Sequence, residues 1–178
     1  CIENNKGKLT NPEAYYIMDM FNWDKDTDLD FWIKNIFLYA KENPAIQGAS
    51  ENIRKLKKDG HTIFIITARK LATPDDKCEQ ELKDKMKKTV KEWLSKNKIE
   101  YNYILFSKED KTKNIIENNI DVMIEDSPNN VKSLSKLTKI ICMDWPYNKG
   151  IKNDNIYRCY NWNEIYMKIK EIENNTEK

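Results

Sequence analysis

Two adjacent carboxylates, Glu125 and Asp126, directly follow an apolar run over residues 122–124. Such a run is typical of the end of a buried strand, and ligands of open α/β sheets bind where strands reach their carboxyl edge. Neighbouring acids there repel each other unless a cation neutralises them, and their oxygens suit a hard metal such as Mg²⁺. The sequence therefore predicts a Mg²⁺ site at Glu125 and Asp126, with a solvated acidic turn as the alternative.

A second strand with a polar end is predicted over residues 61–69, where Gly60 closes a helix and a β-branched and aromatic run follows. This run stops at Thr67. The Thr67 hydroxyl and the backbone N–H groups of Ala68 and Arg69 are donors of the kind that bind a phosphate oxygen at a strand end. The Arg69 guanidinium could add a charge-assisted contact, and an ion pair with one of the many acids is its alternative role.

The composition indicates a soluble globular chain. Of the 178 residues, 34% are charged and 39% are hydrophobic, and the net charge of +2 draws the chain neither to nucleic acid nor to a membrane surface. No apolar run approaches the length of a membrane span, and the polar start is unlike a signal peptide. We therefore expect a cytosolic (cytoplasmic) protein of one domain with an insertion.

Histidine and cysteine residues offer little chemistry here. His61 is the only histidine, so His-based metal sites and Ser/His triads are not expected. The cysteines lie too far apart in the sequence to form a metal-ligand pair, and reduced thiols are expected. They are Cys1, Cys78, Cys142 and Cys159.

Helices and strands alternate along the chain, which predicts an α/β fold with a three-layer, Rossmann-like parallel sheet. Strands are expected to close at Cys1-Ile2 and to cover residues 61–67, 103–106, 122–124 and 140–143. Helices are expected to begin at Asn11-Pro12 and to cover residues 28–43, 49–59, 76–97, 114–118, 128–136 and the stretch after Asn161. Residues 11–48 then form an inserted helical layer.

In these residues and their order, the chain resembles the haloacid dehalogenase-like phosphohydrolases, and within them the 5′(3′)-deoxyribonucleotidase-like group. Residues 65–69 (Ile-Ile-Thr-Ala-Arg) look like the family's second motif, whose Thr binds the transferring phosphoryl group. Residues 124–128 (Ile-Glu-Asp-Ser-Pro) look like the fourth motif, whose acids hold Mg²⁺. Lys111 stands where the third-motif lysine is expected to neutralise phosphate charge, and Lys108 and Lys113 are its rivals.

The resemblance also implies a domain division. Residues 1–10 and 49–178 correspond to the family's core domain, and residues 11–48 correspond to a small helical cap inserted after the first strand. Residues 144–148 (Asp-Trp-Pro-Tyr-Asn) are similar to a loop of bacterial members.

The first motif is where this sequence departs from the family, which has Asp-x-Asp-Gly-Thr after its first strand. Residues 7–10 (Gly-Lys-Leu-Thr) align with the Gly-Thr-Leu-Thr that closes this motif. That alignment places Asn4 at the nucleophile and Lys6 at the acid/base position, and one inserted residue would place Glu3 and Asn5 there instead. Neither register supplies both aspartates.

The resemblance implies a Mg²⁺-dependent phosphatase that acts on a small phosphomonoester such as a (deoxy)nucleoside monophosphate. Its catalytic positions are Asn4, Lys6, Thr67 and Lys111. Because an aspartyl-phosphate intermediate needs an anionic carboxylate and an amide is a poor nucleophile, the alternative is an inactive relative that binds a phosphorylated ligand or a protein partner. A third hypothesis is that residues 1–8 do not represent the working protein. The sequence predicts neither the substrate nor the oligomeric state.

Overall fold

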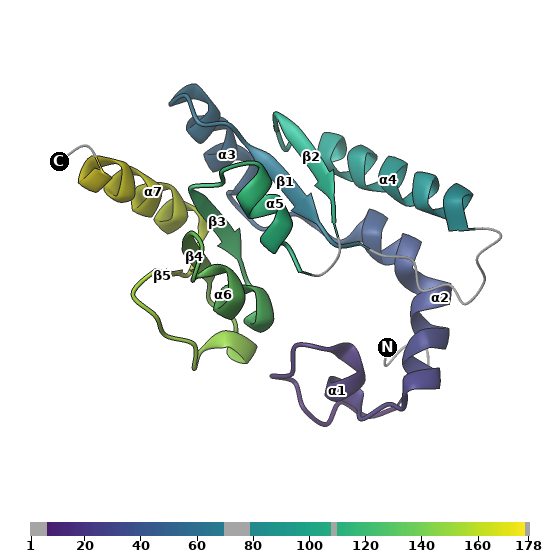
Figure 1. The fold of residues 1–178 in the computed structure, drawn as a ribbon. Coiled ribbons are helices and arrows are strands. Elements are labelled where there is room, and N and C mark those ends of the chain that lie inside the picture. Colours follow the sequence, from purple (N-terminus) through teal and green to yellow (C-terminus); the bar gives the residue numbers. More distant parts are fainter. Residues whose placement is uncertain (1–6, 70–78, 108–109, 177–178) are drawn as a thin grey trace.

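The computed structural model describes residues 7–69, 79–107 and 110–176, and in it parallel strands alternate with helices (Figure 1). The strands are β1 (Phe64–Thr67), β2 (Tyr103–Phe106), β3 (Val122–Glu125), β4 (Lys139–Met143) and β5 (Ile156–Cys159). The helices are α1 (Ile17–Phe21), α2 (Lys25–Glu42), α3 (Ala49–Lys58), α4 (Glu79–Lys96), α5 (Thr112–Glu117), α6 (Pro128–Leu134), α7 (Trp162–Thr176) and the short 3₁₀ helix η2 (Pro146–Asn148). The predicted α/β fold with parallel strands is confirmed.

Within the described residues the strands form two parallel sheets, one of β1 and β2 and one of β3, β4 and β5. Thr67 at the end of β1 is paired with Phe106, and Glu125 at the end of β3 is paired with Cys142. The carboxyl ends of β1 and β3 therefore each stand beside a neighbouring strand end. The strand expected at Cys1-Ile2 lies outside the described residues.

Helices cover both faces of the larger sheet, and the alternation of side chains along β4 shows how. Ile140 and Cys142 are fully buried in a cluster with side chains of α5 and α6. Ile141 and Met143 point the other way, into a cluster with side chains of α3 and α7. This period of two is the normal consequence of strand geometry and produces three layers. Ile66 of β1 lies in the α5–α6 cluster, so the two sheets share one apolar layer.

The segment before α2 folds differently from the sequence-based expectation. A helix beginning at Asn11-Pro12 is wrong, because the N–H groups of Thr10 and Asn11 both donate to the Met20 carbonyl, at 2.8 and 3.0 Å. The chain thus turns back on itself, and helix α1 begins only at Ile17. α2 begins at Lys25, where the Asp24 carboxylate caps the helix by accepting the Thr27 N–H at 2.7 Å.

Figure 1 shows α1 and the first turns of α2 standing apart from the sheets, while the second half of α2 lies beside α4. The Trp93 indole N–H of α4 donates to the Asn43 carbonyl at 2.5 Å and fastens the end of α2 to the core. The division into a core and a cap of residues 11–48 stays a prediction. None of the helices in the described parts of the chain has both the length and the apolar character to span a membrane.

Candidate active site

The carboxyl ends of β1 and β3 open onto one cavity of about 620 Å³. Its wall includes Thr67, Ala68 and Arg69 after β1. Lys111, Glu125 and Asp126 line it from the side of β3 and α5, and Tyr15, Tyr16 and Tyr39 line it from the segment that precedes the core. The structure therefore brings together, in one pocket, the residues that the sequence singled out after two separate strands.

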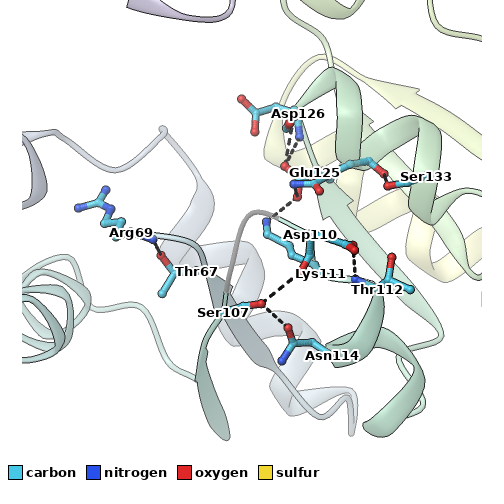
Figure 2. Close-up of polar contacts among 12 residues, drawn as sticks. Thr67, Arg69, Ser107, Asp110, Lys111, Thr112, Asn114, Glu125, Asp126 and Ser133 are labelled. Atoms are coloured by element: carbon cyan, nitrogen blue, oxygen red, sulfur yellow. Dashed lines mark hydrogen bonds and ion pairs between the residues drawn. The ribbon is translucent and has the colours of Figure 1, made fainter. Parts of the chain in front are cut away.

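A short ion pair lies on the pocket wall between Lys111 and Glu125. The Lys111 ammonium is 2.5 Å from Glu125 Oε2, and only 11% of the lysine side chain and 5% of the glutamate side chain are exposed (Figure 2). In such a dry site an ion pair interacts far more strongly than at the surface. Lys113, one of the rivals, is 81% exposed and pairs with Glu117 on its own helix. Lys108 lies outside the described residues.

Glu125 is held on both carboxylate oxygens. Oε1 accepts the backbone N–H groups of Asp126 and Ser127, each at 3.1 Å. Oε2 accepts the Asn130 amide at 3.3 Å in addition to Lys111. A carboxylate has about four lone-pair positions, so these donors occupy its capacity. In this arrangement Glu125 fixes Lys111 and the loop after β3.

Asp126 has different surroundings. The Tyr147 hydroxyl donates to Asp126 Oδ2 at 2.6 Å, and the Asn148 amide donates to the Asp126 carbonyl at 2.9 Å. Burial raises the pKa of the Asp126 carboxyl and the charge of Glu125 raises it further, against the Tyr147 hydrogen bond and Lys111, which lower it. Burial and the bond to Asp126 also raise the pKa of the Tyr147 hydroxyl, so it is a donor at neutral pH.

Arg158 of β5 holds the loop that carries Tyr147. Its guanidinium donates to the Asp144 carboxylate at 2.9 Å and to the Asn148 side-chain oxygen at 2.8 Å. Asn148 is fully buried, and its amide also donates to the Met143 carbonyl at 2.9 Å. Every polar atom of the Asn148 side chain is therefore paired, which sets the position of the adjacent tyrosine.

At the end of β1, Thr67 and Arg69 point to different places. The Thr67 hydroxyl lies 3.4 Å from the Arg69 backbone N–H at the pocket wall. The Arg69 side chain extends away from the Lys111–Glu125 pair (Figure 2). Its guanidinium donates to the Ala40 carbonyl of α2 at 2.9 Å and lies over the rings of Tyr39 and Trp93. Burial lowers the pKa of this guanidinium.

Tyr15 brings the segment before α1 onto the loop after β3. Its ring meets the Tyr147 ring edge to face, with centroids 5.1 Å apart. Burial raises the pKa of the Tyr15 hydroxyl, and a hydrogen bond with Ser127 opposes this rise. Asn4 and Lys6, the predicted first-motif positions, lie outside the described residues.

The fit of the pocket to a Mg²⁺ ion can be judged from its donors. In the described parts of the chain, no three His, Cys, Asp or Glu side chains gather in a way that could hold a metal. Asp126, however, is a partly buried carboxylate whose ionised form is opposed by burial and by the charge of Glu125. A hard cation takes oxygen ligands and would offset both the burial of the Asp126 charge and its repulsion by Glu125. Asp126 therefore fits one position of a Mg²⁺ coordination shell.

Comparison with known proteins also indicates a nucleotidase family. The sequence profile of the family described as "5′ nucleotidase, deoxy (Pyrimidine), cytosolic type C protein" matches residues 19–174. The chain belongs to this family. The resemblance to the nucleotidase group of haloacid dehalogenase-like phosphohydrolases is thereby confirmed.

Two relatives of this 5′-nucleotidase family member carry informative names. A protein of Clostridium acetobutylicum named as a nucleotidase is 28% identical over 170 residues, which cover 93% of this chain and 81% of the relative. A protein of Oceanobacillus iheyensis, whose name marks it provisionally as a nucleotidase, is 25% identical over 164 residues, covering 89% of this chain and 79% of the relative. No solved structure matches the chain significantly.

In this family member, sequence reasoning did not single out the residues that hold Asp126. Tyr147 and Asn148 were noted only as part of a loop similar to one in bacterial members. They follow β4, whose carboxyl end lies beside that of β3, so the rule that strand ends share an edge could have placed them near Asp126. Tyr15 and Arg158 gave no comparable signal, because their roles depend on partners more than a hundred residues away or on an unpredicted strand.

Proposed function

We propose that this chain is a Mg²⁺-dependent phosphatase that hydrolyses a small phosphomonoester such as a (deoxy)nucleoside monophosphate. The family and the names of two relatives support a nucleotidase or phosphatase function. The observation that carries the proposal is the convergence of Thr67, Lys111 and Asp126 on one cavity of about 620 Å³. Cavities of roughly 300–1,000 Å³ are typical of small-molecule sites.

Each residue has a role that follows from its contacts. The Thr67 hydroxyl and the N–H groups after β1 bind phosphoryl oxygens, and the Lys111 ammonium offsets their negative charge. Glu125 keeps Lys111 in place through the 2.5 Å contact. Asp126, hydrogen-bonded to Tyr147, would hold Mg²⁺. Glu125, the other acid predicted to hold the metal, has both carboxylate oxygens engaged by four donors and would act by positioning Lys111. When bound, Mg²⁺ supplies further neutralisation of the phosphoryl charge.

The test is release of inorganic phosphate from deoxynucleoside and nucleoside monophosphates with and without Mg²⁺. We expect Asp126→Asn to lower kcat/KM by about 100-fold or more, the usual cost of losing one group that stabilises developing charge. Asp121→Asn is the matched control, because Asp121 precedes β3 at the opposite end of the strand. Turnover by the wild-type chain no faster than in buffer would overturn the proposal.

A specific feature of the sequence favours a second candidate, binding without hydrolysis. The residues aligned with the nucleophile and the acid/base are Asn4 and Lys6, and neither can serve as a carboxylate nucleophile. A chain of this kind would retain affinity for a phosphorylated ligand through Thr67 and Lys111. The combined variant Asn4→Asp, Lys6→Asp and Lys8→Thr should then acquire phosphatase activity. Turnover of a nucleoside monophosphate by the wild-type chain above the rate in buffer would count against this candidate.

A further inference from the structure

Tyr147 makes two contacts that the proposed roles leave unused. Its hydroxyl donates to Asp126 Oδ2 at 2.6 Å, and its ring meets the Tyr15 ring at 5.1 Å with an interplanar angle of 69°. Asp126 belongs to the loop after β3, whereas Tyr15 belongs to the segment that precedes α1. One side chain therefore contacts both the predicted metal ligand and the part of the chain that covers the pocket.

The position of Tyr147 is set before any ligand arrives. Asn148, the next residue, is fully buried and donates to the carbonyls of Asp126 and Met143, each at 2.9 Å. The Arg158 guanidinium donates to the two oxygens of Asn148, to the side-chain oxygen at 2.8 Å and to the carbonyl at 2.9 Å. A group held in this way loses little freedom when its partner binds a ligand.

The segment that carries Tyr15 is held as a closed turn. The N–H groups of Thr10 and Asn11 and the Thr10 hydroxyl all donate to the Met20 carbonyl, at 2.8 to 3.0 Å. Tyr15 projects from this turn and also contacts Ser127, directly after Asp126. Residues 10–22 therefore meet the loop after β3 through Tyr15, at the residue beside Asp126 and at the tyrosine that braces it.

We infer that Tyr147 is a positioning residue that couples cation binding at Asp126 to the packing of residues 10–22 against the loop after β3. This inference rests on the proposed function, in which Asp126 holds Mg²⁺. The hydrogen bond holds one carboxylate oxygen of Asp126 and so orients the carboxylate for a cation. The Tyr15 ring restricts the Tyr147 ring, so the packing of residues 10–22 on this loop makes the hydrogen bond to Asp126 more rigid.

The coupling must act in both directions. If the packing of residues 10–22 on the loop after β3 raises the Mg²⁺ affinity by some factor, then bound Mg²⁺ stabilises this packing by the same factor. Couplings of this kind commonly amount to about 5–150-fold. Mg²⁺ should therefore slow hydrogen exchange of the Thr10 and Asn11 amides, which are bonded to Met20 only while the turn is intact.

Isothermal titration with MgCl₂ and hydrogen exchange of residues 10–22 test both directions on the full chain. Tyr147→Phe removes the hydroxyl and keeps the ring, and Tyr15→Leu removes the ring that meets it. Tyr160→Phe is the matched control, because Tyr160 is 66% exposed and lies after β5. We expect Tyr147→Phe to weaken Mg²⁺ binding by about 10–100-fold, as loss of a partner of a metal ligand commonly does.

In wild type, Mg²⁺ should slow exchange of the two amides, and in Tyr147→Phe this effect of Mg²⁺ should disappear. Tyr15→Leu should weaken Mg²⁺ binding by about 5-fold or more, and Tyr160→Phe should behave as wild type. A merely structural role of Tyr147 would change the melting temperature without changing the Mg²⁺ dependence of exchange. Equal or tighter Mg²⁺ binding by Tyr147→Phe overturns the coupling alone. No Mg²⁺ binding by wild type overturns the metal role of Asp126 and the coupling with it.

Discussion

The carboxyl ends of β3 and β1 face the same cavity but are built differently. At the end of β3, Glu125 accepts four hydrogen bonds, and Asp126 is held by two residues of the loop after β4. At the end of β1, Thr67 has a 3.4 Å contact with the next loop, and the Arg69 guanidinium binds the Ala40 carbonyl of α2. The end of β3 is therefore held by residues of the core, whereas the end of β1 is hydrogen-bonded to α2.

This difference suggests that the two sides of the pocket have different functions. The β3 side carries charges whose positions are set before a ligand binds, which is what electrostatic stabilisation of a phosphoryl group requires. The β1 side offers a hydroxyl and backbone N–H groups, and its Arg69 side chain is hydrogen-bonded to α2. Mutations on the two sides should therefore have different consequences for stability and for binding.

The largest effect is expected on the β3 side from Lys111→Met. It leaves the Glu125 carboxylate buried at 5% exposure without its cation, and breaking a buried pair in this way usually costs about 3–5 kcal/mol of unfolding free energy. Lys113→Met, which affects an exposed pair on α5, should cost less than about 1 kcal/mol. Urea unfolding followed by circular dichroism measures both. Similar losses for the two variants would mean that the Lys111–Glu125 pair is open to water.

A smaller effect is expected on the β1 side from Arg69→Met. The variant loses a hydrogen bond to the Ala40 carbonyl and the contacts with the Tyr39 and Trp93 rings, and a bond from a charged donor is worth about 1.5–3 kcal/mol. Arg69→Lys should not restore this stability, because an ammonium lacks the planar fork. Arg54→Met is the control, since Arg54 forms an exposed pair with Glu100.

The same variant tests the predicted role of Arg69 in substrate binding. If the guanidinium stays with α2, Arg69→Met should leave the affinity for inorganic phosphate within about threefold of wild type, because an exposed or remote charge contributes little. A loss of phosphate affinity well beyond the loss of stability would mean that Arg69 turns into the pocket. Calorimetric titration with phosphate distinguishes the two outcomes.

Sequence reasoning succeeded where a local pattern determines the structure. β2 was expected at residues 103–106 and is observed there. The acids after β3 were predicted to hold Mg²⁺ and Thr67 to bind phosphate; these roles stay predictions, but the residues do line one cavity. Apolar runs bounded by turns and the rule that strand ends carry ligands are sufficient for these.

It failed where a distant partner decides the structure. Asn11-Pro12 has the local signature of a helix start, yet the Met20 carbonyl draws the chain into a turn instead. β5 is short and gave no strand prediction, but it pairs with β4 and positions Arg158. The hydrogen bond from Tyr147 to Asp126 likewise joins the loops after β4 and β3, across more than twenty residues of sequence. Propensity is a weak guide in such places because tertiary contacts override it.

The smallest effect, and one of opposite sign, is expected from Asp126→Asn in Mg²⁺-free buffer. The pKa of Asp126 is raised above its ordinary value of 3.8 by burial and by the charge of Glu125. The folded protein therefore binds this proton more tightly than the unfolded chain does. The stability contributed by protonated Asp126 is fully present below the unfolded pKa and is lost as the pH rises through the folded pKa.

Asp126→Asn removes this loss, so at neutral pH the variant should be more stable than wild type. For a chain of this size, each 1 kcal/mol of that gain raises the melting temperature by about 2–4 °C. Addition of Mg²⁺ should stabilise wild type and leave the variant unchanged, because the cation then offsets the same charge in wild type alone. Asp121→Asn should show neither effect. A variant less stable than wild type at neutral pH would mean that the hydrogen bond from Tyr147 outweighs burial and repulsion, so that the β3 end is satisfied without a cation.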